Sequence, residues 1–245
     1  MDGTFNSRLA FEATVSEEGP QFVHFSFFKL DIHWRQLPQE LKEKSKEEAR
    51  LLLEKWAGRF AIRPYALTGL RGDADFLLWK IGDRVEDFQG FATSLLGTRL
   101  GGYLETPYAY LAMTRRSKYV GDHEHKGGHG STAKLEPLGK PYLMVYPFVK
   151  THEWYQLSFE ERKRLMGEHF RIGHKYPNVK IHTTYSYGLD DQEFVLAFET
   201  DDPEDFLNLV EELRFAESRK YTLRDTPTFT CVAVPDFGAL LESLG

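Results

Sequence analysis

The stretch Trp34-Arg35-Gln36-Leu37 returns later in the chain as Trp154-Tyr155-Gln156-Leu157. Further echoes keep the same order: Gly72-Asp73-Ala74-Asp75-Phe76-Leu77-Leu78 with Asp190-Asp191-Gln192-Glu193-Phe194-Val195-Leu196, Glu86-Asp87-Phe88 with Glu204-Asp205-Phe206, and Thr106-Pro107 with Thr226-Pro227. The offsets of 118 to 120 residues hold the two copies in register. A repeat of about 100 residues is a whole subdomain, because solenoid modules recur every 20–50 residues or so. The sequence therefore predicts two similar lobes.

Composition limits the class of protein. The chain has 245 residues, 41% of them hydrophobic and 14% aromatic, which suffices for a packed core. A net charge of −6 is not the basic footprint of a nucleic-acid binder. No apolar run approaches the roughly 20 residues of a membrane span, and the first residues do not resemble a signal peptide. The single Cys231 excludes an internal disulfide, so we expect a cytoplasmic protein.

Each copy predicts the β-α-β-β-α-β order of a ferredoxin-like fold. In the first copy we expect strands at 22–28, 64–70, 75–81 and 108–113, and helices at 38–60 and 87–96. In the second we expect strands at 143–149, 179–187, 193–199 and 228–234, and helices at 158–174 and 204–215. Ser158 with Glu161 fits a capping box, and Asp202-Pro203 fits a capped first turn.

The predicted organisation has four parts. They are an N-terminal arm (1–20), a first repeat (21–113), a His- and Gly-rich linker or flap (114–140) and a second repeat (141–245). A four-stranded sheet with both helices on one face leaves its other face bare, and two such sheets can cover each other. We therefore expect an α+β fold in which the two repeats pack sheet to sheet as a pseudo-symmetric dimeric α+β barrel.

The two copies differ chemically on one predicted helix. Alignment on the tryptophans places Glu168-His169 opposite Glu48-Ala49, so a histidine stands where the first copy has alanine. His182 falls on the strand that follows. A helix histidine and a strand histidine on opposite sides of a pocket would suit a haem site, with one axial ligand and one distal group. From spacing alone, an ordinary surface or core histidine remains the simpler interpretation.

Three linker histidines form a weaker candidate site. The neutral imidazoles of His123, His125 and His129 have a spacing that suits zinc or nickel. Because they lie among glycines, a flexible His-rich flap is the simpler interpretation.

A set of motifs runs through the second copy almost from end to end. They are Tyr146-Pro147-Phe148-Val149-Lys150, Trp154-Tyr155-Gln156-Leu157, Glu160-Glu161-Arg162, Glu168-His169, Tyr176-Pro177, the stretch Thr184–Phe194 and Glu212-Leu213-Arg214. In order and spacing they resemble the chlorite dismutase family, which includes the coproheme decarboxylases of haem biosynthesis. The first copy matches that family mainly in architecture. The resemblance implies a homopentamer with a haem-type macrocycle in each second copy.

The resemblance also implies roles for individual residues. His169 would be the proximal iron ligand, and Glu217 would accept a hydrogen bond from its other ring nitrogen. Tyr146 matches the tyrosine that decarboxylases oxidise to a radical beside a propionate, and Lys150 matches the cation that assists it. Arg214 matches a propionate-binding arginine.

Two further positions carry less exact matches. Lys134 falls near another anion-binding position of the family, in a part of the linker where the alignment is loose. His182 stands where chlorite-degrading members carry a distal arginine. An imidazole there would exchange a proton with bound peroxide, which favours peroxide chemistry over chlorite chemistry. The alternative is that His182 points away from the pocket.

The predicted function is oxidative decarboxylation of iron coproporphyrin III (coproheme) to haem b, with hydrogen peroxide as oxidant. Three alternatives remain open. One is a chlorite dismutase-like haem enzyme, and another is a non-catalytic haem-binding or sensor protein. The third is a cofactor-free monooxygenase on the same scaffold, which would not need His169.

Overall fold

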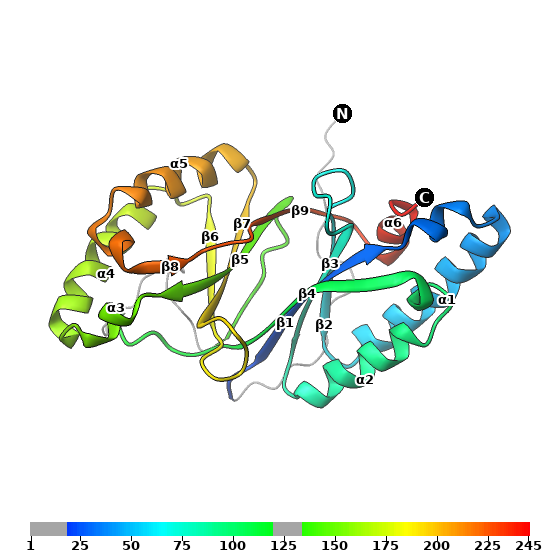
Figure 1. The fold of residues 1–245 in the computed structure, drawn as a ribbon, viewed down its shortest axis with the longest axis horizontal. Coiled ribbons are helices and arrows are strands. Elements are labelled where there is room, and N and C mark those ends of the chain that lie inside the picture. Colours follow the sequence, from blue (N-terminus) through cyan, green and yellow to red (C-terminus); the bar gives the residue numbers. More distant parts are fainter. Residues whose placement is uncertain (1–18, 120–133) are drawn as a thin grey trace. The chain divides into compact units, whose positions relative to one another are not determined.

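The computed structural model describes residues 19–119 and 134–245 (Figure 1). Contacts divide the chain into two compact units, Met1–Leu111 with Cys231–Gly245 and Ala112–Thr230. The linker histidines His123, His125 and His129 lie outside the described residues, so a metal site there stays a prediction.

The first unit has the predicted β-α-β-β-α-β order. Its main elements are β1 (Phe22–Leu30), α1 (Gln39–Ala57), β2 (Ala61–Ala66), β3 (Phe76–Gly82), α2 (Val85–Leu96) and β4 (Leu104–Met113). The 3-10 helices η1 (Ile32–Gln36) and η2 (Gly101–Tyr103) precede α1 and β4. Strands β1 and β2 both pair antiparallel with β3, and β4 lies beside β1.

Helices α1 and α2 cover one face of this sheet and exclude solvent from it. Phe28 and Leu78 of the strands pack with Phe88 and Phe91 of α2 in one apolar cluster, which also includes Ala49 of α1. Ala49 and Phe91 are fully buried. The helix-facing layer of the first unit is therefore a sealed core.

The C-terminal segment belongs to this first unit. Helix α6 (Phe237–Glu242) adds Phe237, Leu240 and Leu241 to the same apolar cluster. The indole of Trp34 donates a hydrogen bond to the carbonyl oxygen of Leu244 at 3.1 Å. The sequence predicts that the second repeat continues to residue 245. Instead, the apolar side chains of α6 are buried in the core of the first unit.

The second unit repeats the order with some additions. Its elements are β5 (Tyr142–Lys150), α3 (His152–Gln156), α4 (Phe159–Gly173), β6 (Lys180–Tyr185), β7 (Phe194–Thr200), α5 (Pro203–Arg214), η3 (Glu217–Tyr221), β8 (Thr222–Arg224) and the start of β9 (Phe229–Ala233). Strand β7 pairs antiparallel with both β5 and β6. Both predicted caps form, because Ser158 accepts from the Glu161 N–H and Asp202 from the Glu204 N–H. Helices α4 and α5 pack on one face of the sheet (Figure 1).

Strand registers confirm the duplication. Ser26 of β1 pairs with Leu78 of β3, and Tyr146 of β5 pairs with Leu196 of β7. These pairs occupy the positions that the sequence repeat predicts. The α+β class and the ferredoxin-like order are therefore confirmed, whereas the packing of one repeat on the other stays a prediction.

Element boundaries differ from the predictions mainly in the first unit, where β4 begins at Leu104 rather than at 108. Strand β2 begins at Ala61 rather than at 64, and ends at Ala66. Helices α3 and α6 and strand β8 were not predicted, since each has six residues or fewer. Among the described residues, no helix is both long and apolar enough to cross a membrane.

Candidate functional site

His169 lies on the inner face of α4. Leu165, His169 and Ile172 are spaced so that they share one side of the helix, and both Leu165 and Ile172 are buried. His169 itself is half-buried. Burial, and then the charge of Lys150, lower the pKa of His169 to about 4. The imidazole is therefore neutral at physiological pH, which is the form that ligates a metal.

The facing side of the sheet is partly open to solvent. Tyr146, Phe148 and Lys150 alternate along β5 on the side that faces the helices, and all three are half-buried. Leu143 and Val145, which precede Tyr146 on the same strand, point to the opposite side and are completely buried. The second unit thus leaves its helix-facing layer accessible at the end of β5 that carries Lys150.

Tyr146 is held between an aromatic ring and a group of charges. Its ring stacks on Phe198 at a centroid distance of 5.5 Å. Burial, and then the charge of Asp225, raise the pKa of Tyr146, while Arg214 and Arg219 oppose the shift. The phenol therefore keeps its proton at neutral pH.

Lys150 lies in an aromatic environment. Its Nζ is 4.3 Å from the ring centroid of Trp154 and 5.1 Å from that of Phe148. Burial lowers the pKa of Lys150 to about 8, although Glu193 acts in the opposite direction. This side chain carries a charge near neutral pH and can still give up or take a proton.

Arg214 does not stand alone. Its Nη1 donates to Oδ2 of Asp225 at 2.6 Å, and Nη1 of Arg219 donates to the same oxygen at 2.8 Å. Two guanidinium groups on one carboxylate leave a net positive charge suited to a further anion. Sequence reasoning missed Asp225 and Arg219, because they reach Arg214 from β8 and η3 through tertiary contact. Their only sequence signal is the excess of cations after α5.

Glu217 is engaged elsewhere in this structure. Its carboxylate accepts hydrogen bonds from Arg164 at 3.1 and 2.9 Å. Within the described residues, no hydrogen bond joins it to the ring of His169, so that role stays a prediction. Lys134 lies half-buried in the segment that leads into β5, and its role as an anion ligand also stays a prediction.

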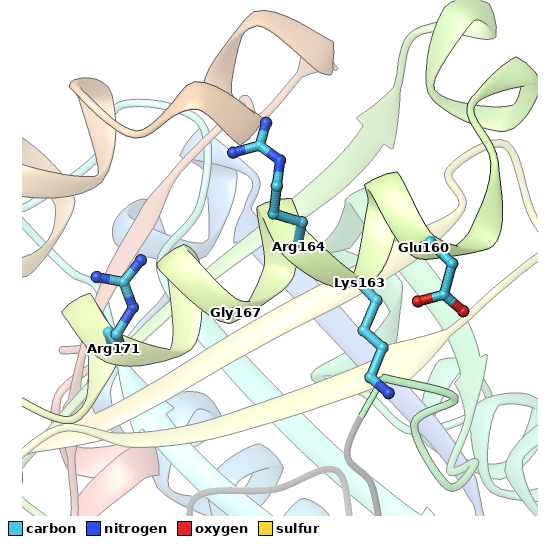
Figure 2. A pocket seen from close by; sticks show the side chains of 5 residues that line it. All are labelled: Glu160, Lys163, Arg164, Gly167 and Arg171. Carbon is cyan, nitrogen blue, oxygen red and sulfur yellow. The ribbon is translucent and has the colours of Figure 1, made fainter.

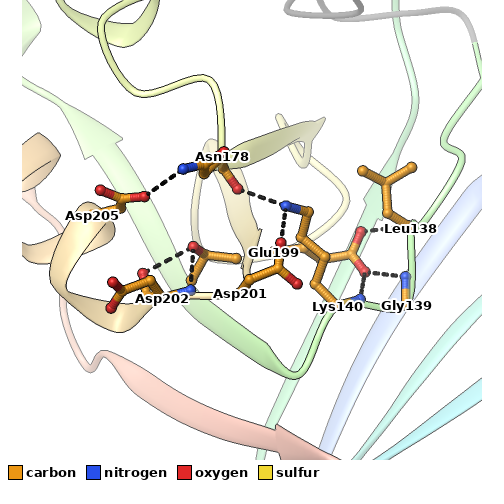
Figure 3. A network of polar contacts seen from close by, with 9 residues as sticks. Leu138, Gly139, Lys140, Asn178, Glu199, Asp201, Asp202 and Asp205 are labelled. Carbon is orange, nitrogen blue, oxygen red and sulfur yellow. Dashed lines mark hydrogen bonds and ion pairs between the residues drawn. The ribbon is translucent and has the colours of Figure 1, made fainter. Parts of the chain in front are cut away.

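His182 lies on the other face of the sheet, which corrects the distal position predicted for it. Ile181 is on the helix-facing side of β6, and strand alternation therefore turns His182 away from α4. The buried His182 ring meets the carboxylate of Glu199 with Nε2 at 2.7 Å from Oε2. Glu199 also accepts the backbone N–H groups of Leu138, Gly139 and Lys140 (Figure 3). His182 thus belongs to a structural network that anchors the segment before β5.

A hollow of about 570 Å³ lies on the exposed side of α4, away from His169. Figure 2 shows its lining: Glu160, Lys163, Arg164, Gly167 and Arg171. These side chains are mostly charged and their face is solvated, as the sequence predicts for an amphipathic helix. The candidate site is therefore the inner side of α4, where His169 faces β5.

The inner site fits an iron porphyrin that bears carboxylates. The neutral ring of His169 offers a nitrogen to iron, and the half-buried ring of Phe148 offers flat apolar surface. Lys150 and Arg214 offer cations to carboxylates. The described residues thus supply each kind of group that such a ligand needs.

Comparison with known proteins agrees with this arrangement. The sequence model of the family described as Chlorite dismutase matches residues 42–234, so the chain belongs to the chlorite dismutase family. The predicted family is therefore confirmed.

Two curated relatives and a solved structure define the similarity further. The chain is 34% identical to a coproheme decarboxylase from Mycolicibacterium smegmatis, over 68% of this chain and 70% of that protein. It is 32% identical to a coproheme decarboxylase from Staphylococcus carnosus, over 63% of this chain and 65% of that protein, just under two thirds of its length. A mutant chlorite dismutase from Candidatus Nitrospira defluvii superposes with a TM-score of 0.84 at 31% identity, covering 92% of this chain and 95% of that one.

Proposed function

We propose that this chain is a coproheme decarboxylase that converts two propionates of iron coproporphyrin III to vinyl groups with hydrogen peroxide, and so yields haem b. The observation that carries the proposal is the layer between α4 and β5. There the neutral His169 faces a strand that bears Tyr146 and Lys150, and all three are half-buried. The two curated relatives, both named coproheme decarboxylase, support the same reaction.

Each residue of the layer has a distinct task. His169 would hold the iron of the substrate through a ring nitrogen. Hydrogen peroxide would oxidise the substrate at that iron. Lys150 and Arg214 bind propionate carboxylates, which fixes their position relative to β5. Tyr146 and Lys150 are four residues apart on one strand, about 13 Å between their Cα atoms. A propionate bound over Phe148 would lie between them.

Tyr146 carries the oxidation to the propionate. Its raised pKa holds the phenol in the protonated form, which can lose an electron while its proton moves to a neighbour. The oxidised phenol then takes a hydrogen atom from the β-carbon of the propionate. Loss of carbon dioxide and of one more electron leaves the vinyl group, and Tyr146 is restored.

Chlorite dismutation has less support from the site. The side chains of β6 that face α4 are Ile181, Thr183 and Tyr185, and none is a cation that would hold an oxyanion near iron. His182 lies on the opposite face of the sheet and does not distinguish the two reactions.

The reaction is tested by mixing the protein with coproheme and adding peroxide. Mass spectrometry should show stepwise loss of two carboxyl groups, and the Tyr146→Phe variant should be slower by about 100-fold or more. Tyr142→Phe is the matched control, because Tyr142 lies on the same strand and packs in the same cluster. Conversion by Tyr146→Phe at the wild-type rate would remove Tyr146 from the mechanism. Oxygen release from chlorite, or haem binding without turnover, would favour the alternatives.

The family resemblance supports two finer proposals. One is assembly as a homopentamer, which the sedimentation mass of the purified protein would test. The other is a cytoplasmic location, which fractionation of cells would test.

A further inference from the structure

A series of polar side chains runs from the backbone of Lys150 to the surface. The backbone N–H of Lys150 donates to Oε2 of Glu193 at 2.7 Å. Burial, and then a hydrogen bond to the carboxylate of Glu193, raise the pKa of the Tyr155 hydroxyl. That hydroxyl lies 2.9 Å from the hydroxyl of Tyr187, and the two tyrosines are 37% and 45% exposed. A carboxylate next to the site is thus linked to solvent by two phenols.

The side chain of Lys150 has no other polar connection in the described structure. Its Nζ faces the rings of Trp154 and Phe148, and no hydrogen bond or ion pair joins it to a described residue. Glu193 is the carboxylate whose charge acts on it. One water, or a swing of the flexible lysine chain, would close the gap between them. Among the described side chains, Glu193 is therefore the proton partner that we assign to Lys150.

The proposed reaction requires such exchange. Conversion of one propionate to a vinyl group releases carbon dioxide, one proton and two electrons. Reduction of one hydrogen peroxide to two waters takes up two electrons and two protons. The proton released on the propionate side comes from the phenol of Tyr146 when it is oxidised, since the β-hydrogen atom later restores that phenol. This proton has to move off the phenol once for every vinyl group formed. Because peroxide reduction takes up two protons, the complete reaction also draws one proton from solvent, so protons are exchanged in both directions.

We propose that Glu193, Tyr155 and Tyr187 form the route by which Lys150 exchanges protons with solvent during decarboxylation. The inference rests on the proposed function. Lys150 takes the proton released beside the propionate, Glu193 receives it, and the hydroxyls of Tyr155 and Tyr187 pass it on to water. Glu193 and the two tyrosines act through Lys150 and do not touch the macrocycle.

Charged and titratable neighbours agree with this direction of transfer. Glu193 favours the charged form of Lys150, whereas Arg219 disfavours it. Burial and the bond to Glu193 raise the pKa of Tyr155, and burial raises that of Tyr187 to about 12, with Tyr119 and Tyr185 adding smaller effects. Both phenols therefore stay protonated at neutral pH. Each can relay a proton only if its hydroxyl accepts one proton and donates another in the same step. Lys150 also acts on His169, and the neutral ring of His169 is assigned to iron.

The test is the Tyr155→Phe variant of the full chain, loaded with coproheme and mixed with peroxide. Removal of one hydroxyl breaks the route and leaves the ring in place. Vinyl formation should slow by about tenfold. The solvent deuterium isotope effect should increase, and the lost rate should return as the concentration of a non-coordinating sulfonate buffer rises at constant pH and ionic strength. Tyr187→Phe should show the same buffer dependence to a smaller degree.

Tyr176→Phe is the matched control. The hydroxyl of Tyr176 donates to Glu212 at 3.1 Å. The substitution therefore removes the same kind of tyrosine–carboxylate bond from the same unit and leaves Glu193, Tyr155 and Tyr187 unchanged. The proposal is overturned if Tyr155→Phe reacts at the wild-type rate. It is also overturned if the variant is slow but insensitive to both buffer and deuterium, because a purely structural defect would behave in that way. Failure of the wild-type protein to convert coproheme would instead refute the proposed function.

Discussion

The two repeats share a strand register but use the layer between helices and sheet differently. In the first repeat this layer holds Ala49 and Phe28 in a sealed apolar core. In the second, the corresponding positions are His169 and Phe148, and both are half-buried. In the first repeat, apolar side chains fill the layer. In the second repeat, the layer is accessible and is lined by the titratable side chains of His169, Tyr146 and Lys150.

A small polar cluster in the sealed layer sharpens this contrast. Ser26 occupies the position that Tyr146 occupies in the second repeat, and it accepts a hydrogen bond from the buried Lys80 at 2.9 Å. Phe198, which stacks on Tyr146, occupies the position of Lys80. Nζ of Lys80 also lies 5.1 Å from the ring centroid of Phe91. The difference teaches that titratable side chains alone do not make a site, because the layer must also admit a ligand.

The largest effect should follow from removing the histidine that distinguishes the second repeat. His169→Ala takes away the proposed iron ligand, so coproheme affinity should fall by about 100-fold. Titration followed at the Soret band would measure this. His174→Ala, at the end of the same helix, should bind as the wild type does. Unchanged affinity and spectrum in His169→Ala would assign the iron to another residue and remove the main contrast between the copies.

The converse change should damage the first repeat without creating a site. Ala49 has no exposed surface, so Ala49→His forces a larger polar ring into a closed core. We expect the free energy of unfolding to fall by about 2 kcal/mol, measured by urea denaturation. Gain of a second coproheme per chain would show that the first repeat retains a usable layer, contrary to the comparison.

A smaller, pH-dependent effect should come from Lys80. Burial lowers its pKa in the folded protein to about 7, whereas an unfolded lysine titrates near 10.4. Between these values the unfolded chain binds more protons, so stability rises with pH. Lys80→Met removes that dependence. Its stability relative to wild type should therefore be greatest at or below pH 7 and decline, by on the order of 1 kcal/mol, by pH 9.

Urea denaturation at the two pH values would measure this difference. Lys44→Met is the control, because Lys44 is exposed on α1 and, among the described residues, pairs with Glu40 alone. A wild-type-like pH dependence in Lys80→Met would mean that Lys80 is charged in the fold throughout this range.

The sequence predicts the elements well because their signals are local. Hydrophobic periodicity, the Ser158 and Asp202 caps and the internal repeat all act within one segment, and the repeat supplies each element twice. His169 was also found locally, through its contrast with Ala49. Its inner position on α4 follows from its spacing with Leu165 and Ile172.

The remaining features depend on contacts that no local pattern reveals. A strand residue changes face with a shift of one position, so the strand assignment of His182 did not determine its direction. Asp225 and Arg219 meet Arg214 only because the loop after β8 returns to the end of α5. The route through Tyr155 and Tyr187 likewise joins α3 to the turn before β7.

The position of α6 has a consequence for how the protein is made. Residues Cys231–Gly245 complete the first unit, yet they follow the whole of the second unit along the chain. During synthesis, the first unit therefore lacks Phe237 and Leu240 until all of the second unit has been made, although most of its residues are synthesised first. Loss of the last segment by premature termination would leave the apolar core of the first unit incomplete.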